Sequence, residues 1–365
     1  MRNFVNLGEY TRIRTGKLDA NASSPNGKYP FFTCSQEPLR IESYSYDCEC
    51  VLVAGNGDLN VKYYNGKFDA YQRTYIIESL DKDKLLPRYM FYFLELYIET
   101  LRKESIGGVI KYIKLGNLTN AKIFLPDLAT QQKIIDILDK SVAAIARRKK
   151  QLASCDMLVK SQFIEMFEKG QQYEETFFGD VCLYVRNGAN IKQSKGAGGY
   201  PITRIETLSN DVFNSDRLGY ADITDLSRYT NYLLKKGDIL ISHINSIAYL
   251  GRAVQYRGEV ASPVIHGMNL LCARMKEGYN PTYIEWYLKS KRAKDYIATI
   301  TKKAVNQASI TTSDLKKMAI PVPTKEKQDQ FACFVEQTDK SKFRIKQSLE
   351  KLETLYKALL QKYFG

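Results

Sequence analysis

The chain has 365 residues, 44% of them hydrophobic, which suits two domains of moderate size better than one compact domain. Fifty-four Lys and Arg against forty Asp and Glu give a formal net charge of +14, which favours a polyanionic partner such as nucleic acid. No apolar run approaches the about 20 residues of a membrane-spanning helix, and the first residues lack the apolar core of a signal peptide, so membrane and secretory roles are not expected.

The cysteines argue against a disulfide framework and against a zinc site. The seven are scattered and include no C-x-x-C pair. Free thiols are typical of a reducing compartment, so we expect a cytoplasmic protein with no bound metal.

Residues 1–124 are predicted to form a first globule of mixed α/β structure, mostly sheet. The β-branched and aromatic runs CVLVAG (50–55) and RTYIIES (73–79) lie between Gly and Asn turns and predict strands. One helix is predicted from Pro87 to about Ser105. Proline suits the first helical turn, because the N–H that it lacks would have no partner inside the helix.

Residues 125–170 are predicted to be a helical region. Pro126 ends the last strand, and from about Leu128 to Phe167 apolar residues recur at alternating steps of three and four, which predicts a long amphipathic helix with a narrow seam. Polar residues, Lys149 and Asp156, occupy two seam places. The apolar seam comprises Ile135, Leu138, Val142, Ile145, Leu152, Val159 and Phe163.

Residues 171–321 repeat the globule, and residues 322–365 repeat the helical region. GKYPFF (27–32) matches GGYPIT (198–203), VLVA (51–54) matches ILIS (239–242), and PRYMFYFL (87–94) matches PTYIEWYL (281–288). The offset between matches climbs steadily from 171 to 197, as expected for a duplicated domain with loop insertions. In this second globule the runs DILISHI (238–244) and MNLLCARM (268–275) predict strands, and one helix is predicted from Pro281 to about Lys303.

The second long helix has its own seam of Val335, Ile345, Leu349, Leu352, Tyr356 and Leu359. A helix of about 40 residues is about 60 Å long, more than one such globule needs for its core. The predicted fold class is therefore α+β: two mixed α/β globules joined and separated by two long antiparallel helices in a coiled coil, with an internal pseudo-twofold duplication. The alternative is that each helix packs on its own globule.

Catalytic patterns are weak in this chain. It contains no G-x-x-x-x-G-K-[ST] loop and no G-x-G-x-x-G after a strand, so nucleotide binding is not expected. His243 and His266 have no neighbouring Cys or His at metal spacing. Each is interpreted as a polar contact in a loop or, at least as well, as an ordinary structural histidine. NPTY (280–283) differs by one residue from the N-P-P-Y of amino-methyltransferases and reads better as a helix start.

The polar loops that follow the matched strands supply candidate DNA contacts, because Asn and Gln can pair with adenine, and Arg and Lys with guanine or phosphate. Solvated polar loops are also normal, so each residue alone is weak evidence. The candidates in the first globule are Asn56, Asn60, Lys62, Tyr64, Arg73 and Lys111. Those in the second are Lys192, Lys195, Arg204, Ser242, His243, Asn245, Ser246, Arg252, Asn306 and Gln307.

With two diverged globules and two seamed helices in view, the sequence resembles the specificity (S) subunits of Type I restriction-modification systems, over essentially its whole length. The similar segments are GDILIS (237–242), YNGKFDA (64–70), and the junctions IFLPDLATQQKI (123–134) and IPVPTKEKQDQF (320–331), followed by KSQFIEMF and LETLYKALLQKYFG. Family members usually carry Glu-Gln after the prolines, where this chain has Thr130-Gln131 and Lys327-Gln328. The glutamines match, and the acid does not.

The resemblance implies a target recognition domain followed by a conserved helical region, repeated, and no catalytic activity. It further implies recognition of a bipartite double-stranded DNA site and docking of two methyltransferase (M) subunits, and through them of restriction (R) subunits, for adenine methylation or cleavage of unmethylated DNA in bacterial defence. S-adenosylmethionine, ATP and Mg²⁺ are expected in the partner subunits and not in this chain. The alternative is a coiled-coil scaffold whose basic globules bind protein or nucleic acid without sequence readout.

Overall fold

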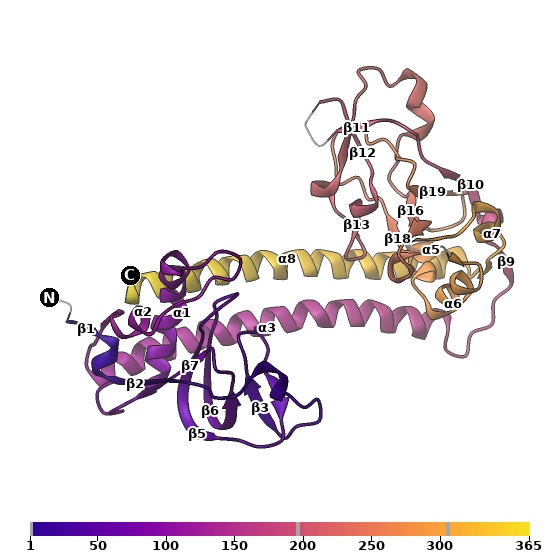
Figure 1. The fold of residues 1–365 in the computed structure, drawn as a ribbon. Coiled ribbons are helices and arrows are strands. Elements are labelled where there is room, and N and C mark those ends of the chain that lie inside the picture. Colours follow the sequence, from indigo (N-terminus) through magenta and orange to yellow (C-terminus); the bar gives the residue numbers. More distant parts are fainter. Residues whose placement is uncertain (1–2, 195–197, 304–306) are drawn as a thin grey trace. The chain divides into compact units, whose positions relative to one another are not determined.

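The computed structural model describes residues 3–194, 198–303 and 307–365 (Figure 1). The chain divides into two compact units, Met1–Leu152 with Arg344–Gly365 and Ala153–Phe343, which we call unit 1 and unit 2. Both borders fall inside the long helices α3 (Leu128–Phe167) and α8 (Lys325–Phe364). Each long helix therefore belongs partly to unit 1 and partly to unit 2.

Unit 1 is built on a six-stranded sheet in the order β2–β7–β5–β6–β3–β4 (Figure 1). Neighbouring strands are antiparallel except for the parallel pair β3 and β6. The strands are β2 (Thr11–Thr15), β3 (Tyr29–Phe32), β4 (Leu39–Ile41), β5 (Tyr46–Ala54), β6 (Val61–Ala70) and β7 (Thr74–Ser79). Helix α1 (Pro87–Glu104) packs against β5 and β6.

The period-two alternation of β5 divides the core of unit 1 between the two sheet faces. Val51 and Val53 join the cluster that contains Tyr89 and Leu94 of α1, whereas Cys50 and Leu52 join a second cluster with Phe68. Both faces of β5 are thus buried, and its run from Cys50 to Ala54 is hydrophobic throughout.

Three short elements complete unit 1. Strands β1 (Phe4–Asn6) and β8 (Lys122–Phe124) pair antiparallel, and α2 (Leu115–Thr119) precedes β8. Pro126 follows β8, and α3 begins at Leu128, so the strand ends where the sequence predicted.

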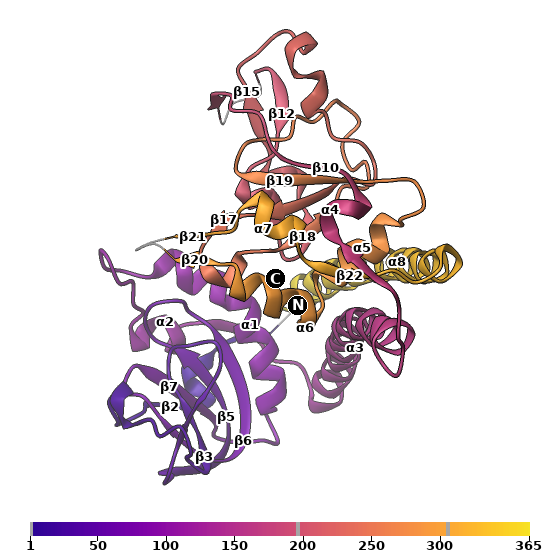
Figure 2. The same cartoon turned by 90° about the vertical axis from the view of Figure 1, so that its right-hand side faces the viewer.

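Unit 2 contains a four-stranded sheet in the order β10–β19–β16–β18 and several shorter ladders (Figure 2). Its strands are β9 (Glu175–Phe177), β10 (Cys182–Asn187), β11 (Gln193–Ser194), β12 (Tyr200–Ile202), β13 (Leu208–Ser209), β14 (Val212–Phe213), β15 (Gly219–Ala221), β16 (Ile239–Ser242), β17 (Ile244–Asn245), β18 (Ala253–Gln255), β19 (Leu270–Met275), β20 (Lys302–Lys303), β21 (Ala308–Ser309) and β22 (Ala319–Pro321). Its shorter helices are α4 (Phe178–Val181), α5 (Pro281–Leu288), α6 (Lys291–Thr299) and α7 (Thr312–Lys316).

The strand ladders repeat the duplication that the sequence predicted. Phe4 pairs with Phe124 in unit 1, and the residues at offsets 171 and 197, Glu175 and Pro321, pair in unit 2. The central strands agree as well, because β5 pairs with β7 as β16 pairs with β19. The two units therefore share one scaffold, although their sequences have diverged.

One predicted helix is wrong in its extent. The stretch from Pro281 to about Lys303 forms two helices, α5 and α6, and not one. Ser290 has extended backbone angles between them, and its side-chain hydroxyl accepts a hydrogen bond from the backbone N–H of Ala293 at 3.2 Å. Ser290 is thus an N-cap, and the chain turns there to start a new helix.

The long helices pair antiparallel, as predicted. In unit 1 the Lys149 ammonium of α3 lies 3.1 Å from Glu353 of α8, and in unit 2 the Lys342 ammonium of α8 lies 2.5 Å from Asp156 of α3. The later residue of α3 thus pairs with the earlier residue of α8, as in an antiparallel pair. The polar residues at two seam places of α3, Lys149 and Asp156, therefore make ion pairs across the two helices.

The predicted seam residues differ in burial along the two paired helices. Ile135 and Leu138 are core residues of unit 1, and Val159, Phe163 and Val335 are core residues of unit 2. The seam residues between these ends are half-buried, apart from Val142, which is 37% exposed; they are Ile145, Leu152, Ile345, Leu349 and Leu352. Tyr356 and Leu359 are partly buried against the core of unit 1. Each long helix thus packs into unit 1 at one end and into unit 2 at the other, which differs from the alternative that each helix packs on its own globule, and the two helices also pair.

Candidate nucleic-acid interface

Two loops of unit 1 come together beyond the end of strand β5. The backbone N–H of Gly57 donates to the carbonyl of Lys111 at 2.9 Å, the N–H of Ile113 donates to Gly55 at 3.0 Å, and Asn56 forms a bridge with Tyr112. On the other side, the N–H of Gly55 donates to the carbonyl of Arg73 at 2.8 Å. Of the DNA-contact candidates, Asn56, Arg73 and Lys111 therefore lie at one edge of the sheet.

Arg73 and Lys111 are exposed, and Asn56 is half-buried. Two cations beside an amide provide donors for phosphate and for base edges. These three residues are the candidates in unit 1 whose placement suits contact with nucleic acid.

The structure gives Asn60 a structural position, contrary to the prediction that it contacts DNA. Asn60 is 8% exposed, and its side-chain amide donates to the carbonyls of Cys34 at 2.8 Å and Asp58 at 2.9 Å. Lys62 donates to Asn60 and to the carbonyl of Ser35 at 2.7 Å, and burial lowers the pKa of its ammonium group. The two side chains hold neighbouring loops together, and this use of Asn60 leaves no amide free for a base.

Tyr64 also has a packing role. Its ring lies 5.1 Å from the ring of Phe32 and 5.6 Å from that of Phe68, and its hydroxyl donates to the carbonyl of Lys67 at 3.3 Å. The half-buried ring belongs to the second core cluster of unit 1.

Unit 2 places a small three-stranded sheet, β17–β21–β20, after its central strand β16. Asn245 pairs with Ala308 in this sheet, and the exposed Gln307 precedes β21. Ser246 is exposed beside Asn245. The backbone N–H of Ser246 donates to the side-chain oxygen of Asn245 at 2.8 Å. Asn245, Ser246 and Gln307 therefore lie together, whereas Lys195 and Asn306 fall outside the described residues.

Ser242 and His243 are buried, contrary to the prediction that they contact DNA. Ser242 is 1% exposed at the end of β16 and accepts a hydrogen bond from the Asn245 amide at 3.2 Å. His243 is 7% exposed, and burial lowers the pKa of its imidazole. Ser242 ends the fully buried strand β16 and His243 follows it directly, so both belong to the predicted strand run DILISHI and not to the exposed loop after it.

The remaining candidates of unit 2 are spread over its surface. The Arg252 guanidinium lies 3.0 Å from Asp211, donates to the carbonyl of Leu208 at 2.7 Å and stacks over Tyr249. Arg204 lies 3.6 Å from Glu206, and Lys192 is exposed. The internal contacts of Arg252 position a loop, whereas the latter two cations remain accessible.

The junction glutamines of the repeat have a role that the sequence match did not reveal. Gln131 is fully buried; its side-chain oxygen accepts the N–H of Leu86 at 3.0 Å, and its amide donates to the carbonyls of Lys84 and Pro126. Gln328 repeats this in unit 2 with the N–H of Asn280 at 2.8 Å and the carbonyl of Pro323 at 2.9 Å. Each glutamine ties the start of a long helix to the N-cap of α1 or α5.

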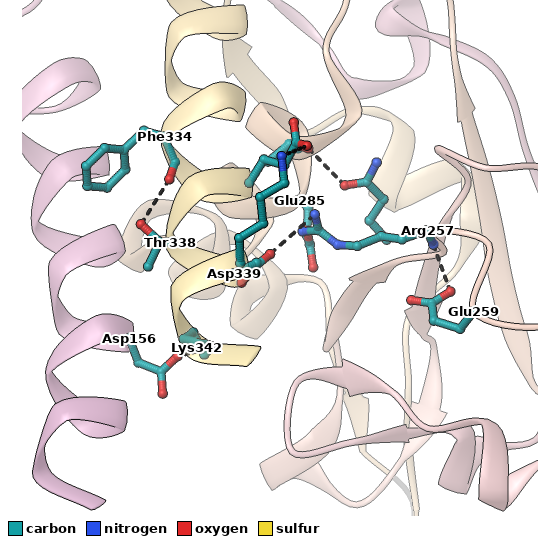
Figure 3. A network of polar contacts seen from close by, with 12 residues as sticks. Asp156, Arg257, Glu259, Glu285, Phe334, Thr338, Asp339 and Lys342 are labelled. Carbon is teal, nitrogen blue, oxygen red and sulfur yellow. Dashed lines mark hydrogen bonds and ion pairs between the residues drawn. The ribbon is translucent and has the colours of Figure 1, made fainter. Parts of the chain in front are cut away.

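A charged cluster adds a second connection in unit 2 (Figure 3). The Glu285 carboxylate of α5 is 4% exposed and lies 3.2 Å from Arg257 and 2.8 Å from Lys289, while Arg257 also lies 3.5 Å from Asp339 of α8. The backbone N–H of Arg257 donates to Glu259 at 2.9 Å. A buried carboxylate needs such partners, so this cluster fixes α5 against α8.

Within the described residues, no group of three or more His, Cys, Asp or Glu side chains is placed to hold a metal ion. The helices described here include none whose length and apolarity would let it cross a bilayer.

Comparison with known proteins gives the family. A model described as the Type I restriction modification DNA specificity domain matches residues 3–154 and 171–354, once on each copy of the repeat. The type I restriction enzyme EcoDI specificity subunit of Escherichia coli is 38% identical over 43% of this chain and 34% of its own length. The MjaX specificity subunit of Methanocaldococcus jannaschii is 36% identical over 55% of this chain and 47% of its own length.

These matches span between about a third and a half of the length of the two curated relatives. Among solved structures, a Type I restriction-modification S subunit from M. genitalium superposes with a TM-score of 0.62 at 17% identity, covering 100% of this chain and 96% of the other. This likeness confirms the predicted fold of two mixed α/β domains with two long helices. By the match of the family model to both halves, the chain belongs to the family of Type I restriction modification DNA specificity proteins.

Proposed function

We propose that this chain is the non-catalytic DNA-recognition subunit of a Type I restriction-modification complex, in which unit 1 and unit 2 each recognise one part of a bipartite double-stranded target. The observation that carries the proposal is the repeated ladder. Both units place a loop strand against the residues that follow the central strand, β5 or β16, and they fill this common edge with different side chains.

A shared scaffold with different side chains at one edge is what two separate base-recognition surfaces require. Asn56, Arg73 and Lys111 provide donors and acceptors in unit 1, and Asn245, Ser246 and Gln307 provide them in unit 2. Because the major groove presents a distinct pattern for each base pair, different side chains select different sequences. The net charge of +14 supplies the attraction to phosphate that is common to all sequences.

We further propose that two M subunits dock along the long helices and that R subunits join through them. The duplication supports two equivalent docking positions. Large apolar side chains on the long helices are exposed to solvent in both units, and exposed apolar side chains are typical of protein-binding surfaces. They include Ile137 and Leu355 in unit 1 and Met157, Leu158 and Phe343 in unit 2. S-adenosylmethionine, ATP and Mg²⁺ would then be bound by the partner subunits.

The test is selection of bound DNA from a random duplex library by the full chain. We expect an enriched motif with two specified parts and an unspecified gap. Replacing residues 1–124 by the same region of another family member should change one part only. A chain that binds all duplexes alike, with affinity falling equally for all of them as salt rises, would contradict the proposal and favour a scaffold without sequence readout.

A further inference from the structure

The segment Ile106–Tyr112 of unit 1, which we call the 106–112 loop, is closed tightly at its base. Ile106 and Tyr112 exchange both backbone hydrogen bonds, at 3.0 and 2.9 Å. Gly107 has φ +116°, and a Cβ there would lie 2.5 Å from the carbonyl oxygen of Ile110. The loop therefore has a defined shape that depends on glycine.

The far end of this loop is apolar and exposed to solvent. Val109 is 102% exposed and Ile110 is 64% exposed, although both are large β-branched side chains. Hydration of such side chains is unfavourable, and neither contributes to a core cluster of the unit. Two adjacent side chains of this kind at the end of a closed loop indicate a surface that is covered when a partner binds.

The surroundings of the loop favour DNA as that partner. Lys103 and Lys111 are exposed beside it, and neither takes part in an ion pair within the described residues. The base of the loop is bonded to Asn56 and Gly57, next to Arg73, so the apolar end extends from the proposed recognition edge itself. Cations at the base attract phosphate, and an apolar end can enter a groove.

A hairpin closes at the matching place in unit 2. Strands β20 and β21 form a hairpin after α6, and β21 pairs with β17 directly beyond the central strand β16. Lys302 pairs with Ser309 in this hairpin, as Ile106 pairs with Tyr112 in unit 1, and the β20 residues Lys302 and Lys303 are exposed. Because the hairpin is kept in two units whose sequences have diverged, we attribute it to the function of the unit and not to a local accident of folding.

We propose that the 106–112 loop is a wedge that inserts Val109 and Ile110 between neighbouring base pairs of the DNA held by unit 1. The inference rests on the proposed DNA recognition and adds to it a physical action on the duplex. Unstacking one base step costs a few kcal/mol, which burial of the two apolar side chains and closer phosphate contacts offset. Sequence preference at that step would then follow the ease of unstacking and not hydrogen bonding alone.

The test compares the full chain with the double variant V109S/I110S. A matched control is Leu80→Ser, because Leu80 lies in the same unit and is 63% exposed, close to the 64% of Ile110. All three changes are at the surface, so urea unfolding midpoints should stay unchanged. DNA affinity is measured by fluorescence anisotropy, and unstacking by the fluorescence of 2-aminopurine placed in turn along the duplex. The duplex is the enriched one or, if none is enriched, one of mixed sequence at low salt.

We expect 2-aminopurine fluorescence to rise at one step with the natural chain and not with V109S/I110S, and affinity to fall about tenfold in that variant and within about twofold in Leu80→Ser. No rise at any position with the natural chain would overturn the wedge. So would a variant that binds DNA normally but no longer co-purifies with an M subunit, since the loop would then be a protein contact. Motif enrichment is scored separately and bears only on the proposed function.

Discussion

Removing the junction glutamine of unit 2 should weaken that unit substantially. In Gln328→Ala the backbone N–H of Asn280 and the carbonyl of Pro323 lose their side-chain partner at a position where Gln328 is 1% exposed. Each buried backbone group left without a partner costs about 1–1.5 kcal/mol, so the free energy of unfolding should fall by about 2–3 kcal/mol. With a urea dependence of about 2 kcal/mol per molar, the midpoint should drop by about 1 M.

Trp286 makes this measurement specific to unit 2. It is the sole tryptophan in the sequence, and its ring centroid lies 6.1 Å from that of Phe331 in the unit 2 core cluster. Its fluorescence in a urea titration therefore reports unfolding of unit 2. The matched control is Gln330→Ala, because Gln330 is an exposed glutamine of the same helix. Its midpoint should move by less than about 0.3 M. Equal shifts for both variants would refute the assignment of Gln328 as a connecting residue.

Three further predictions use the same titration or its circular-dichroism counterpart. Phe163→Ala should cost about 3–5 kcal/mol because Phe163 is 3% exposed, whereas Val142→Ala, at 37% exposed, should cost less than about 1; similar costs would contradict the uneven seam. Lys149→Ala and Glu353→Ala should each change stability by less than about 0.5 kcal/mol, since both partners are exposed, and a larger loss would show that the pair sets the helix register. Burial lowers the pKa of His266 to about 4, so the folded unit 2 resists its protonation, and stability should fall by about 3 kcal/mol as pH drops from 6.5 to 4. His266→Gln should lack this part of the acid sensitivity, and an unchanged pH profile would refute it.

The scaffold was predictable because duplication leaves a signal that does not depend on any one residue. The match at offsets 171 and 197 anticipates the pairing of Phe4 with Phe124 and of Glu175 with Pro321. The break between α5 and α6 was not predictable in this way. Ser290 caps α6 without the Glu or Gln three residues later that completes a capping box, so the sequence carried only a weak start signal.

The candidate site was harder to predict, because the same polar residue types serve recognition and packing. Asn60 and Asn56 follow the same strand four residues apart, yet Asn60 is buried and donates to two carbonyls, whereas Asn56 lies at the proposed recognition edge. The side that a loop residue faces depends on distant segments such as the one around Cys34, which no local pattern encodes. Val109 and Ile110 directly precede the candidate Lys111, and only their exposure in the structure singles them out.

The border of unit 1 inside helix α8 has a consequence for biosynthesis. Leu360 and Phe364 complete the hydrophobic core around Tyr89 and Phe93 of α1, but a ribosome makes them more than two hundred residues after that helix. The core of unit 1 therefore stays incompletely packed while unit 2 is being translated. A premature stop shortly before Leu360 would accordingly damage the half of the protein that was made first.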